Sequence, residues 1–216
     1  MIRIENSGLQ TSIQDSGRFF YRKFGVPCSG TMDVFSARMA NSLLGNAVDE
    51  AVMEFAYTGP TLFFQESVVI AISGADFKVR CGEVLVPLNK PFLVPQNSVL
   101  KIGSAKQGVY GYLAIKGGFK TPKILGSRSF YKEITGQSKL AKGDKLESNS
   151  SLQQFLTTAS IKFQPISSTQ RISVFSGPEF DNLDKKTQEK LFNENFNINS
   201  QSNRMAVLLD YEIPFS

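Results

Sequence analysis

Short apolar segments of strand length dominate the chain between residues 48 and 116. Turn-forming residues separate them, as in Gly59-Pro60 and Asn89-Lys90-Pro91. Short runs rich in Val, Ile, Leu and Phe and bounded by such residues are typical of β-strands. The predicted strands cover residues 52–55, 61–64, 68–72, 77–79, 92–94, 99–102 and 110–115.

The connections between these strands are too short to hold crossover helices. Parallel strands need such crossovers, so we expect mainly antiparallel sheets that curl into a barrel or a sandwich. The predicted fold class is therefore mainly β with a few short helices.

The first of two predicted helices covers residues 34–44. Asp33 stands where an N-cap residue accepts hydrogen bonds from the free amides of the first turn. Phe35, Met39 and Leu43 follow at intervals of four residues, so we expect them on one inward face.

The second predicted helix covers residues 185–193. Asp184 is its expected N-cap, and Leu191 and Phe192 are expected to face inward.

The composition limits the chemistry of this chain of 216 residues. It contains no histidine, which excludes Ser-His-Asp hydrolysis and His-ligated zinc within the chain. Its two cysteines, Cys28 and Cys81, are too few for a disulfide scaffold or a Cys-rich zinc site. No signal peptide or membrane-spanning run is apparent, so we expect a soluble, cytoplasmic protein without a metal site.

The formal net charge of +5 is concentrated in one segment. Residues 116–145 hold eight basic side chains and only two acidic ones, Glu133 and Asp144. A solvated surface explains this pattern. A nucleic-acid site that uses Phe119, Phe130 and Tyr131 as stacking groups is the alternative, and we do not expect it.

The expected domain division follows residue 120. Residues 1–120 form an N-terminal β-barrel-like domain with one helix, and residues 121–216 form a second β-rich domain. Residues 147–170 are rich in Ser, Thr and Gln and are expected to be a linker.

One glycine-rich segment, residues 117–121, superficially resembles a phosphate-binding loop. Phe119 separates the glycine from the lysine, and the first glycine is misplaced for that motif. We therefore expect a glycine turn there. The chain also lacks a Met-Lys biotinylation site.

A polar segment near the N-terminus is a stronger candidate for function. Residues 8–18 collect polar side chains between glycines, and residues 21–33 lead from them into the first predicted helix. Glycines beside polar groups allow close approach of the backbone to a ligand.

These segments resemble the opening of a family known as allophanate hydrolase subunit 2, the C subunit of 5-oxoprolinase or biotin-dependent carboxyltransferase. The resemblance covers the whole chain, although family members continue beyond its last residues, so we expect a shortened member with an incomplete second domain. The other matching motifs, in order, are Ser36-Ala37-Arg38, Ala40-Asn41, Leu44-Gly45-Asn46, Glu54, Gly59-Pro60, Ser73-Gly74-Ala75-Asp76, Leu113 to Gly118, Leu125-Gly126-Ser127-Arg128-Ser129, Gly143-Asp144, Ser176-Gly177-Pro178 and Ser202-Asn203-Arg204-Met205.

The resemblance implies cyclophilin-like β-barrel domains and an ATP-dependent enzyme that cleaves an amide or lactam, such as 5-oxo-L-proline to L-glutamate. A biotin-dependent carboxyl transfer, with biotin supplied by another protein, is the related reaction. The implied partner is a companion chain resembling the B subunit of 5-oxoprolinase, with which or by which ATP is bound. The alternative is a non-catalytic regulatory subunit that binds a partner resembling a kinase inhibitor.

Both reactions build negative charge on an oxygen, which favours fixed donors such as arginine. We therefore expect one oxyanion-stabilising cleft formed by residues far apart in the sequence. Six residues also have structural interpretations: Asp15 as a turn cap paired with Arg18, Glu54 as a buried partner of an arginine, Asp33 as the helix cap, Asp76 as a turn residue, and Asn203 and Arg204 as links between a strand and a loop. The expected catalytic residues are Asp15, Arg18, Arg128 and Arg204, and the expected substrate-binding residues are Gln14, Glu54 and Asn203.

Overall fold

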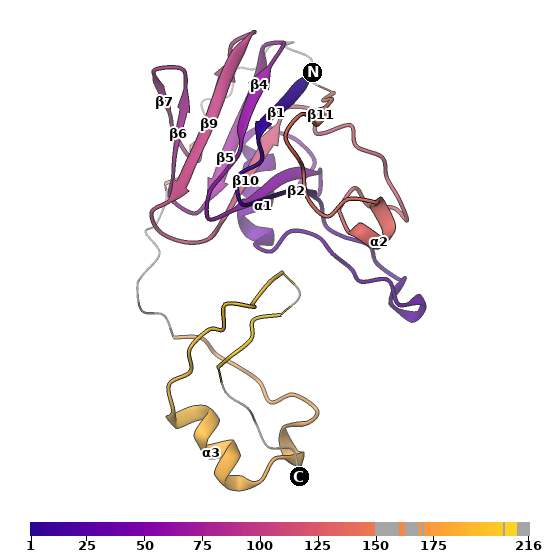
Figure 1. The fold of residues 1–216 in the computed structure, drawn as a ribbon, viewed down its shortest axis with the longest axis vertical. Helices are drawn as coiled ribbons and strands as arrows, with labels where there is room; N and C mark the ends of the chain where they lie inside the picture. The colour runs from indigo at the N-terminus through magenta and orange to yellow at the C-terminus, as the bar shows by residue number, and fades with distance from the viewer. Residues whose placement is uncertain (150–159, 163–168, 170, 205, 211–216) are drawn as a thin grey trace. The chain divides into compact units, whose positions relative to one another are not determined.

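The computed structural model of the protein describes residues 1–149, 160–162, 169, 171–204 and 206–210. It forms two compact units, Met1–Ile166 and Ser167–Ser216, which are described separately (Figure 1). The division predicted after residue 120 differs from the boundary of these units, because residues 145–146 add a strand to the first one. Most of the expected linker, 147–170, lies outside the described residues. Within the described residues, every helix is too short or too polar to cross a membrane.

Two antiparallel sheets form the first unit, as the mainly β prediction required. The six-stranded sheet has the order β11-β1-β4-β9-β6-β7, and the five-stranded sheet has the order β2-β3-β10-β5-β8. The strands of the first sheet are β11 (Lys145–Leu146), β1 (Ile2–Asn6), β4 (Thr61–Phe64), β9 (Ser98–Ala105), β6 (Phe77–Cys81) and β7 (Val84–Val86). Those of the second are β2 (Gln10–Gln14), β3 (Val52–Ala56), β10 (Tyr110–Ile115), β5 (Val68–Gly74) and β8 (Pro91–Val94).

The main core contains side chains from both sheets. In β6 the buried Phe77 and Val79 alternate with the exposed Lys78, as expected for a strand with one face in the core. The rings of Phe55 in β3 and Phe77 meet edge to face with centroids 4.9 Å apart. Every residue of β3 and β5 is buried, which requires a cover on the other face of the second sheet.

That cover is α1 (Val34–Leu43), which packs on β5 and β10. Asp33 caps it as predicted, because its carboxylate accepts the Ser36 N–H at 3.0 Å. The predicted inward face was wrong at Phe35, whose side chain is 76% exposed. The buried face instead carries small residues, including Ala37 and Ala40, which let the helix approach the sheet closely.

The second unit contains α3 (Lys185–Asn193), whose limits agree with the prediction. Asp184 caps it by accepting the Thr187 N–H at 2.8 Å. The inward placement of Phe192 was wrong, because its side chain is exposed and contacts the Phe180 ring of the 3-10 turn η2 (Phe180–Asn182).

Candidate functional site

A network around Asp15 joins two of the motifs found in the sequence. Asp15 directly follows β2, and its carboxylate accepts hydrogen bonds from the N–H of Gly17 at 2.8 Å and of Arg128 at 2.6 Å. It also accepts from the hydroxyls of Ser127 at 2.6 Å and Ser129 at 2.7 Å. The Asp15 carboxylate is therefore hydrogen-bonded to residues more than 110 positions away in the chain.

The hydrogen bonds set the charge state of Asp15. Burial raises the pKa of this carboxyl, but the four hydrogen bonds outweigh burial and hold the pKa below its ordinary value. Asp15 is therefore ionised at neutral pH.

Arg18 is a buried residue that contacts the same segment, residues 124–129. Its side chain is 1% exposed, and its guanidinium donates to the carbonyl of Ile124 at 3.1 Å and to that of Ser129. The expected direct pairing with Asp15 is replaced by these carbonyl contacts. Burial lowers the pKa of Arg18, and the charge of Asp15 partly offsets this.

Asp15 and Arg18 both contact a strained turn at residues 124–127. Ile124 and Ser127 exchange backbone hydrogen bonds of 2.8 and 3.2 Å around Leu125 and Gly126, whose φ values of 53° and 79° are both left-handed. A left-handed leucine costs about 1–2 kcal/mol. Asp15 and Arg18 supply contacts that hold this turn and the backbone of Arg128 in place.

The structure brings four predicted site residues together: Gln14, Asp15, Arg18 and Arg128. Gln14 donates to the Ser12 hydroxyl at 3.0 Å and lies at the end of the same strand. Their catalytic and substrate-binding roles stay predictions.

The other three predicted residues are Glu54, Asn203 and Arg204. Glu54 is buried in β3, where its carboxylate accepts the Met32 N–H at 2.8 Å and also contacts the Tyr112 hydroxyl. Asn203 and Arg204 belong to the second unit, where the Asn203 N–H donates to the Ala206 carbonyl at 3.0 Å. Their convergence with the first unit stays a prediction.

A polar row crosses the second sheet beneath the start of α1. Ser12, Glu54, Tyr112 and Ser73 stand in register on β2, β3, β10 and β5. The Tyr112 hydroxyl accepts the Asp33 N–H at 2.7 Å. Burial, and then the charge of Glu54, raise the pKa of Tyr112, so this hydroxyl stays protonated. The row fixes the loop that leads into the helix.

A cavity of about 530 Å³ opens beside this loop. Its walls come from the start of α1, the end of β5, the turn before β10 and the segment before β8. We call it the Asp33 cavity. Its lining residues are Asp33, Phe35, Ser36, Met39, Gly74, Ala75, Asn89, Gly108, Val109, Tyr110, Ile161 and Lys162.

Asn89 is the unusual residue of this cavity. It is 2% exposed, its φ of 56° is left-handed, and its Oδ1 has no hydrogen-bond partner among the described residues. Its backbone is firmly held, because its N–H donates to Ile72 at 2.8 Å and its carbonyl accepts from Ile161 at 3.1 Å. A buried unpartnered acceptor is costly in a folded protein, so it is a candidate contact for a ligand N–H.

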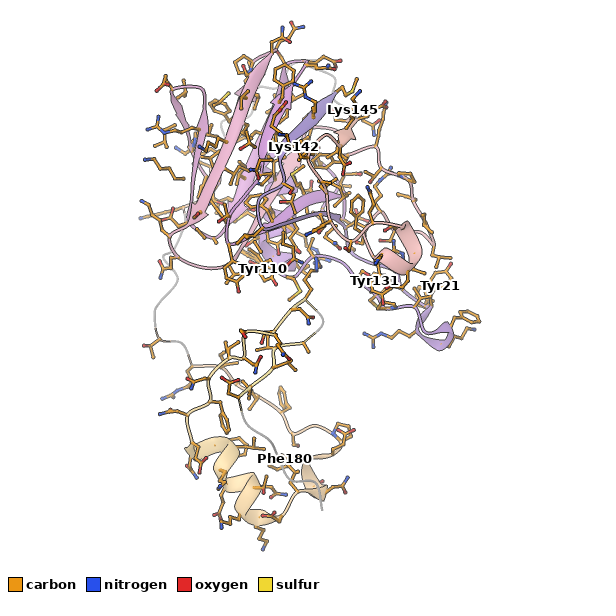
Figure 2. The ribbon with its side chains drawn as sticks, in the orientation of Figure 1. Tyr21, Tyr110, Tyr131, Lys142, Lys145 and Phe180 are labelled. Atoms are coloured by element: carbon orange, nitrogen blue, oxygen red, sulfur yellow. The ribbon has the colours of Figure 1, made fainter. Side chains whose placement is uncertain are left out.

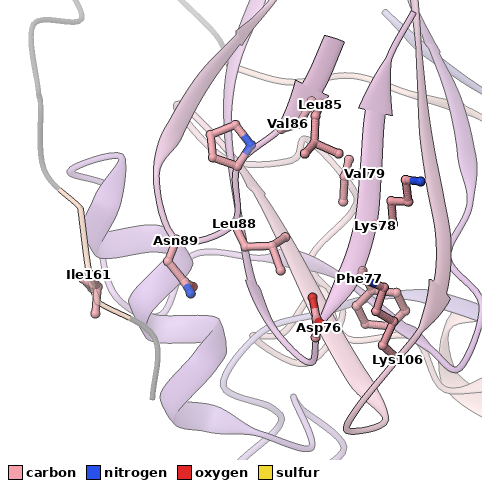
Figure 3. Close-up of a pocket in the computed structure, with 11 residues that line it drawn as sticks. Asp76, Phe77, Lys78, Val79, Leu85, Val86, Leu88, Asn89, Lys106 and Ile161 are labelled. Atoms are coloured by element: carbon pink, nitrogen blue, oxygen red, sulfur yellow. The ribbon is translucent and has the colours of Figure 1, made fainter. Parts of the chain in front are cut away.

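Asn89 also lines a neighbouring cavity of about 460 Å³ (Figure 3). Apolar side chains such as Val79, Val86 and Leu88 form most of its wall. Asp76, the expected turn residue, lies at this cavity, and its carbonyl accepts the Lys106 N–H at 2.8 Å. Asn89 therefore stands between two apolar spaces.

The comparison with known families agrees with the motifs. The family described as "Carboxyltransferase domain, subdomain A and B" matches residues 24–214. The chain belongs to this carboxyltransferase domain family.

Relatives of this carboxyltransferase domain occur as a separate chain and within larger enzymes. The chain is 36% identical to urea amidolyase of Saccharomyces cerevisiae over 96% of its own length, but it spans 12% of that protein. It is 31% identical to the C subunit of 5-oxoprolinase from Haemophilus influenzae over 95% of its length and spans 67% of that protein. The solved urea carboxylase of Kluyveromyces lactis superposes with a TM-score of 0.82 at 29% identity, with 98% of this chain and 20% of that chain covered.

The carboxyltransferase domain has no phosphate cradle in its glycine-rich segment. The N–H groups of Gly117 and Gly118 already donate to Asn46 Oδ1 and to the Ile115 carbonyl. The Glu50 carboxylate lies against Gly118, and Phe119 is fully buried. These residues do not fit ATP, and Phe119 is not available as a stacking group for nucleic acid. The described residues also contain no cluster of potential metal ligands.

Sequence reasoning missed Asn89 and Tyr110 as cavity residues. Asn89 precedes Lys90-Pro91, which predicts a turn, and Tyr110 begins a predicted strand. Asp33 was assigned to capping only, although the same cap places it at the cavity.

Proposed function

We propose that this chain is one subunit of an ATP-dependent enzyme complex that cleaves a small amide or lactam, with 5-oxo-L-proline as the substrate and L-glutamate as the product. The related alternative within the same proposal is carboxyl transfer to an amide nitrogen, as the name urea carboxylase of the solved relative suggests. In either case the substrate amide binds in the Asp33 cavity.

The complementarity of this cavity to an amide group carries the proposal. The buried Asn89 Oδ1 offers an acceptor for an amide N–H. The Ser36 N–H of the first turn of α1 already donates to Asp33, so the proposed donors for the amide oxygen are the N–H groups of Val34 and Phe35, at the positive end of the helix dipole. Apolar side chains such as Met39 and Val109 form part of the wall around these contacts.

The absence of histidine agrees with catalysis by charge stabilisation. Attack on an amide carbon builds negative charge on its oxygen, and fixed backbone donors stabilise that charge without a proton transfer. Glu54, Tyr112 and Ser73 of the polar row keep those donors fixed, because they hydrogen-bond to the loop before the helix and to its first turn.

The Asp15 network has a supporting role in this proposal. It holds the backbone of Arg128. We propose that Arg128 and Arg204 stabilise negative charge in the reaction and that Asn203 binds the substrate. Gln14 and Glu54 then support substrate binding indirectly, through their hydrogen bonds to Phe130 and Met32.

We assign ATP to the companion chain, because the glycine-rich segment 117–121 does not fit a nucleotide phosphate. Biotin, where the reaction uses it, is supplied by another protein. The unpaired Cys28 and Cys81 agree with a cytoplasmic complex.

The test is reconstitution of the protein with a companion chain resembling the B subunit of 5-oxoprolinase. We expect ATP hydrolysis that depends on 5-oxo-L-proline and releases L-glutamate. A parallel assay with urea and a carboxybiotin carrier distinguishes the carboxyl-transfer reaction. A correctly assembled complex that turns over neither substrate would contradict the enzymatic proposal and favour the regulatory alternative.

The companion chain needs a docking surface, and the loop around η1 (Arg22–Phe24) is suited to it. The loop projects from the first unit, with Tyr21 near its tip (Figure 2). Phe20 is 92% exposed at a left-handed φ of 74°, and Phe24 is exposed beside it. Residues 17–32 contain Arg22 and Lys23 but no acidic residue. Aromatic rings with arginine are enriched in protein interfaces, so the expected partner surface is acidic and apolar.

Replacing Phe20 by glycine is expected to weaken association with the companion chain at least tenfold in Kd, because a buried aromatic anchor is lost. The free protein should not lose stability, since glycine tolerates a positive φ. Titration calorimetry with the companion chain measures the association. The matched control is Phe175→Ser, a fully exposed phenylalanine of the second unit. Equal affinities for wild type and Phe20→Gly would contradict this docking surface.

A further inference from the structure

A smaller cavity of about 270 Å³ lies on the first unit and shares no lining residue with the Asp33 cavity. Segments on both sides of α2 (Lys132–Thr135) form its walls. We call it the Arg128 cavity. Its lining residues are Thr121, Pro122, Ile124, Arg128, Phe130, Thr135, Gln137, Leu140, Asp144, Lys145 and Leu146.

Two polar groups at this cavity lack hydrogen-bond partners among the described residues. Thr121 is 8% exposed, and its hydroxyl is buried without a hydrogen bond. The Nε of Arg128 is also buried without a hydrogen bond, and Glu50 Oε1 forms an ion pair with it at 3.9 Å. A buried hydroxyl and a buried guanidinium N–H are expensive to leave unpaired, which indicates a missing acceptor.

The charges around the cavity disfavour a ligand with two negative charges. Arg128 and Lys145 supply two positive charges, while Asp144 and Glu50 supply two negative ones. Asp144 is already engaged, because its Oδ2 accepts the Ala141 N–H at 2.8 Å. A dianion such as phosphate would meet both carboxylates, whereas a monoanion can pair with Arg128.

The walls limit the rest of the ligand. Ile124, Phe130 and Leu140 present apolar side chains to the cavity, so a compact apolar body fits beside the charged group. The volume admits only a small molecule, since drug-sized ligands occupy cavities of about 300–1,000 Å³.

We propose that the Arg128 cavity binds a small monocarboxylate with an apolar body. Its carboxylate accepts hydrogen bonds from Arg128 Nε and from the Thr121 hydroxyl, and its apolar part packs on Phe130 and Leu140. This cavity shares no lining residue with the amide site of the proposed function, although Arg128 is used by both proposals, and carboxylate binding does not require turnover.

Titration calorimetry of the full chain with isovalerate tests the proposal, with its neutral isostere isovaleramide and inorganic phosphate as comparisons. We expect saturable binding of isovalerate, and binding at least tenfold weaker for the amide and for phosphate. Thr121→Val should weaken isovalerate binding several-fold without lowering the melting temperature, because it removes an unpartnered hydroxyl. Arg128→Gln should abolish the preference for the acid over the amide.

A matched pair of lysines separates the site from general surface charge. Lys145 lines the cavity and Lys142 does not, although both are exposed lysines near each other in the sequence (Figure 2). Lys145→Gln is expected to weaken binding, and Lys142→Gln to leave it unchanged. Equal binding of acid and amide, no saturable binding, or equal effects of the two lysine variants would overturn the proposal. None of these results depends on turnover by the complex.

Discussion

Replacing Asp15 by asparagine is expected to lower the free energy of unfolding by about 3 kcal/mol, since charge-assisted hydrogen bonds contribute about 1.5–3 kcal/mol each and an amide can replace only part of them. The carboxylate accepts four hydrogen bonds from two distant segments. An amide nitrogen facing the Ser127 hydroxyl or the Arg128 N–H would place a donor against a donor. Urea denaturation at pH 7 measures the loss.

The pH dependence of this effect has a defined sign. The folded state lowers the pKa of Asp15 below that of the unfolded chain. A lowered carboxyl pKa adds stability above the unfolded value of about 3.9, and this stability is lost as the pH falls through the folded pKa. The difference between wild type and Asp15→Asn should therefore be largest at neutral pH and shrink below about pH 4.

Asp49→Asn is the control for Asp15→Asn, because Asp49 is an exposed aspartate. It should change the stability by less than about 0.5 kcal/mol. If Asp15→Asn were as stable as this control at pH 7, the network would not hold the Leu125–Gly126 turn.

Replacing Asn89 by glycine is expected to lower kcat/KM of the reconstituted complex about 30-fold, which corresponds to about 2 kcal/mol for one buried hydrogen bond to the substrate. Glycine accepts the left-handed φ of this position, so the backbone and the fold should be retained. Steady-state kinetics with 5-oxo-L-proline measure the effect.

Asn97→Gly provides a matched control for Asn89→Gly. Asn97 also has a left-handed φ, of 57°, but it is an exposed turn residue. Its replacement should leave kcat/KM unchanged. Equal kinetics for the two variants would show that the Asn89 side chain does not contact the substrate.

The sequence predicted most of the fold because its strands are strongly apolar. The seven predicted strands correspond to β3, β4, β5, β6, β8, β9 and β10, and the two predicted helices to α1 and α3. The strands β1 and β2 were missed because polar residues interrupt them, and β7 and β11 because they have only three and two residues. Phe35 was misplaced because spacing alone does not reveal that small residues face the sheet.

The candidate site could be predicted only in part. The motifs around Asp15 and Arg128 were recognised in the sequence, but their shared hydrogen bonds depend on a contact over more than 110 residues. The importance of Asn89 depends on an unpaired buried atom, which no local pattern encodes. Cavities form from several segments at once, so their residues become apparent only when the chain is folded.

A crystal structure of the reconstituted complex with 5-oxo-L-proline tests the central claim most directly. We expect the lactam in the Asp33 cavity, with its oxygen at the first turn of α1 and its N–H within hydrogen-bond distance of Asn89 Oδ1. A lactam bound elsewhere on the complex, with the Asp33 cavity filled only by solvent, would contradict this account.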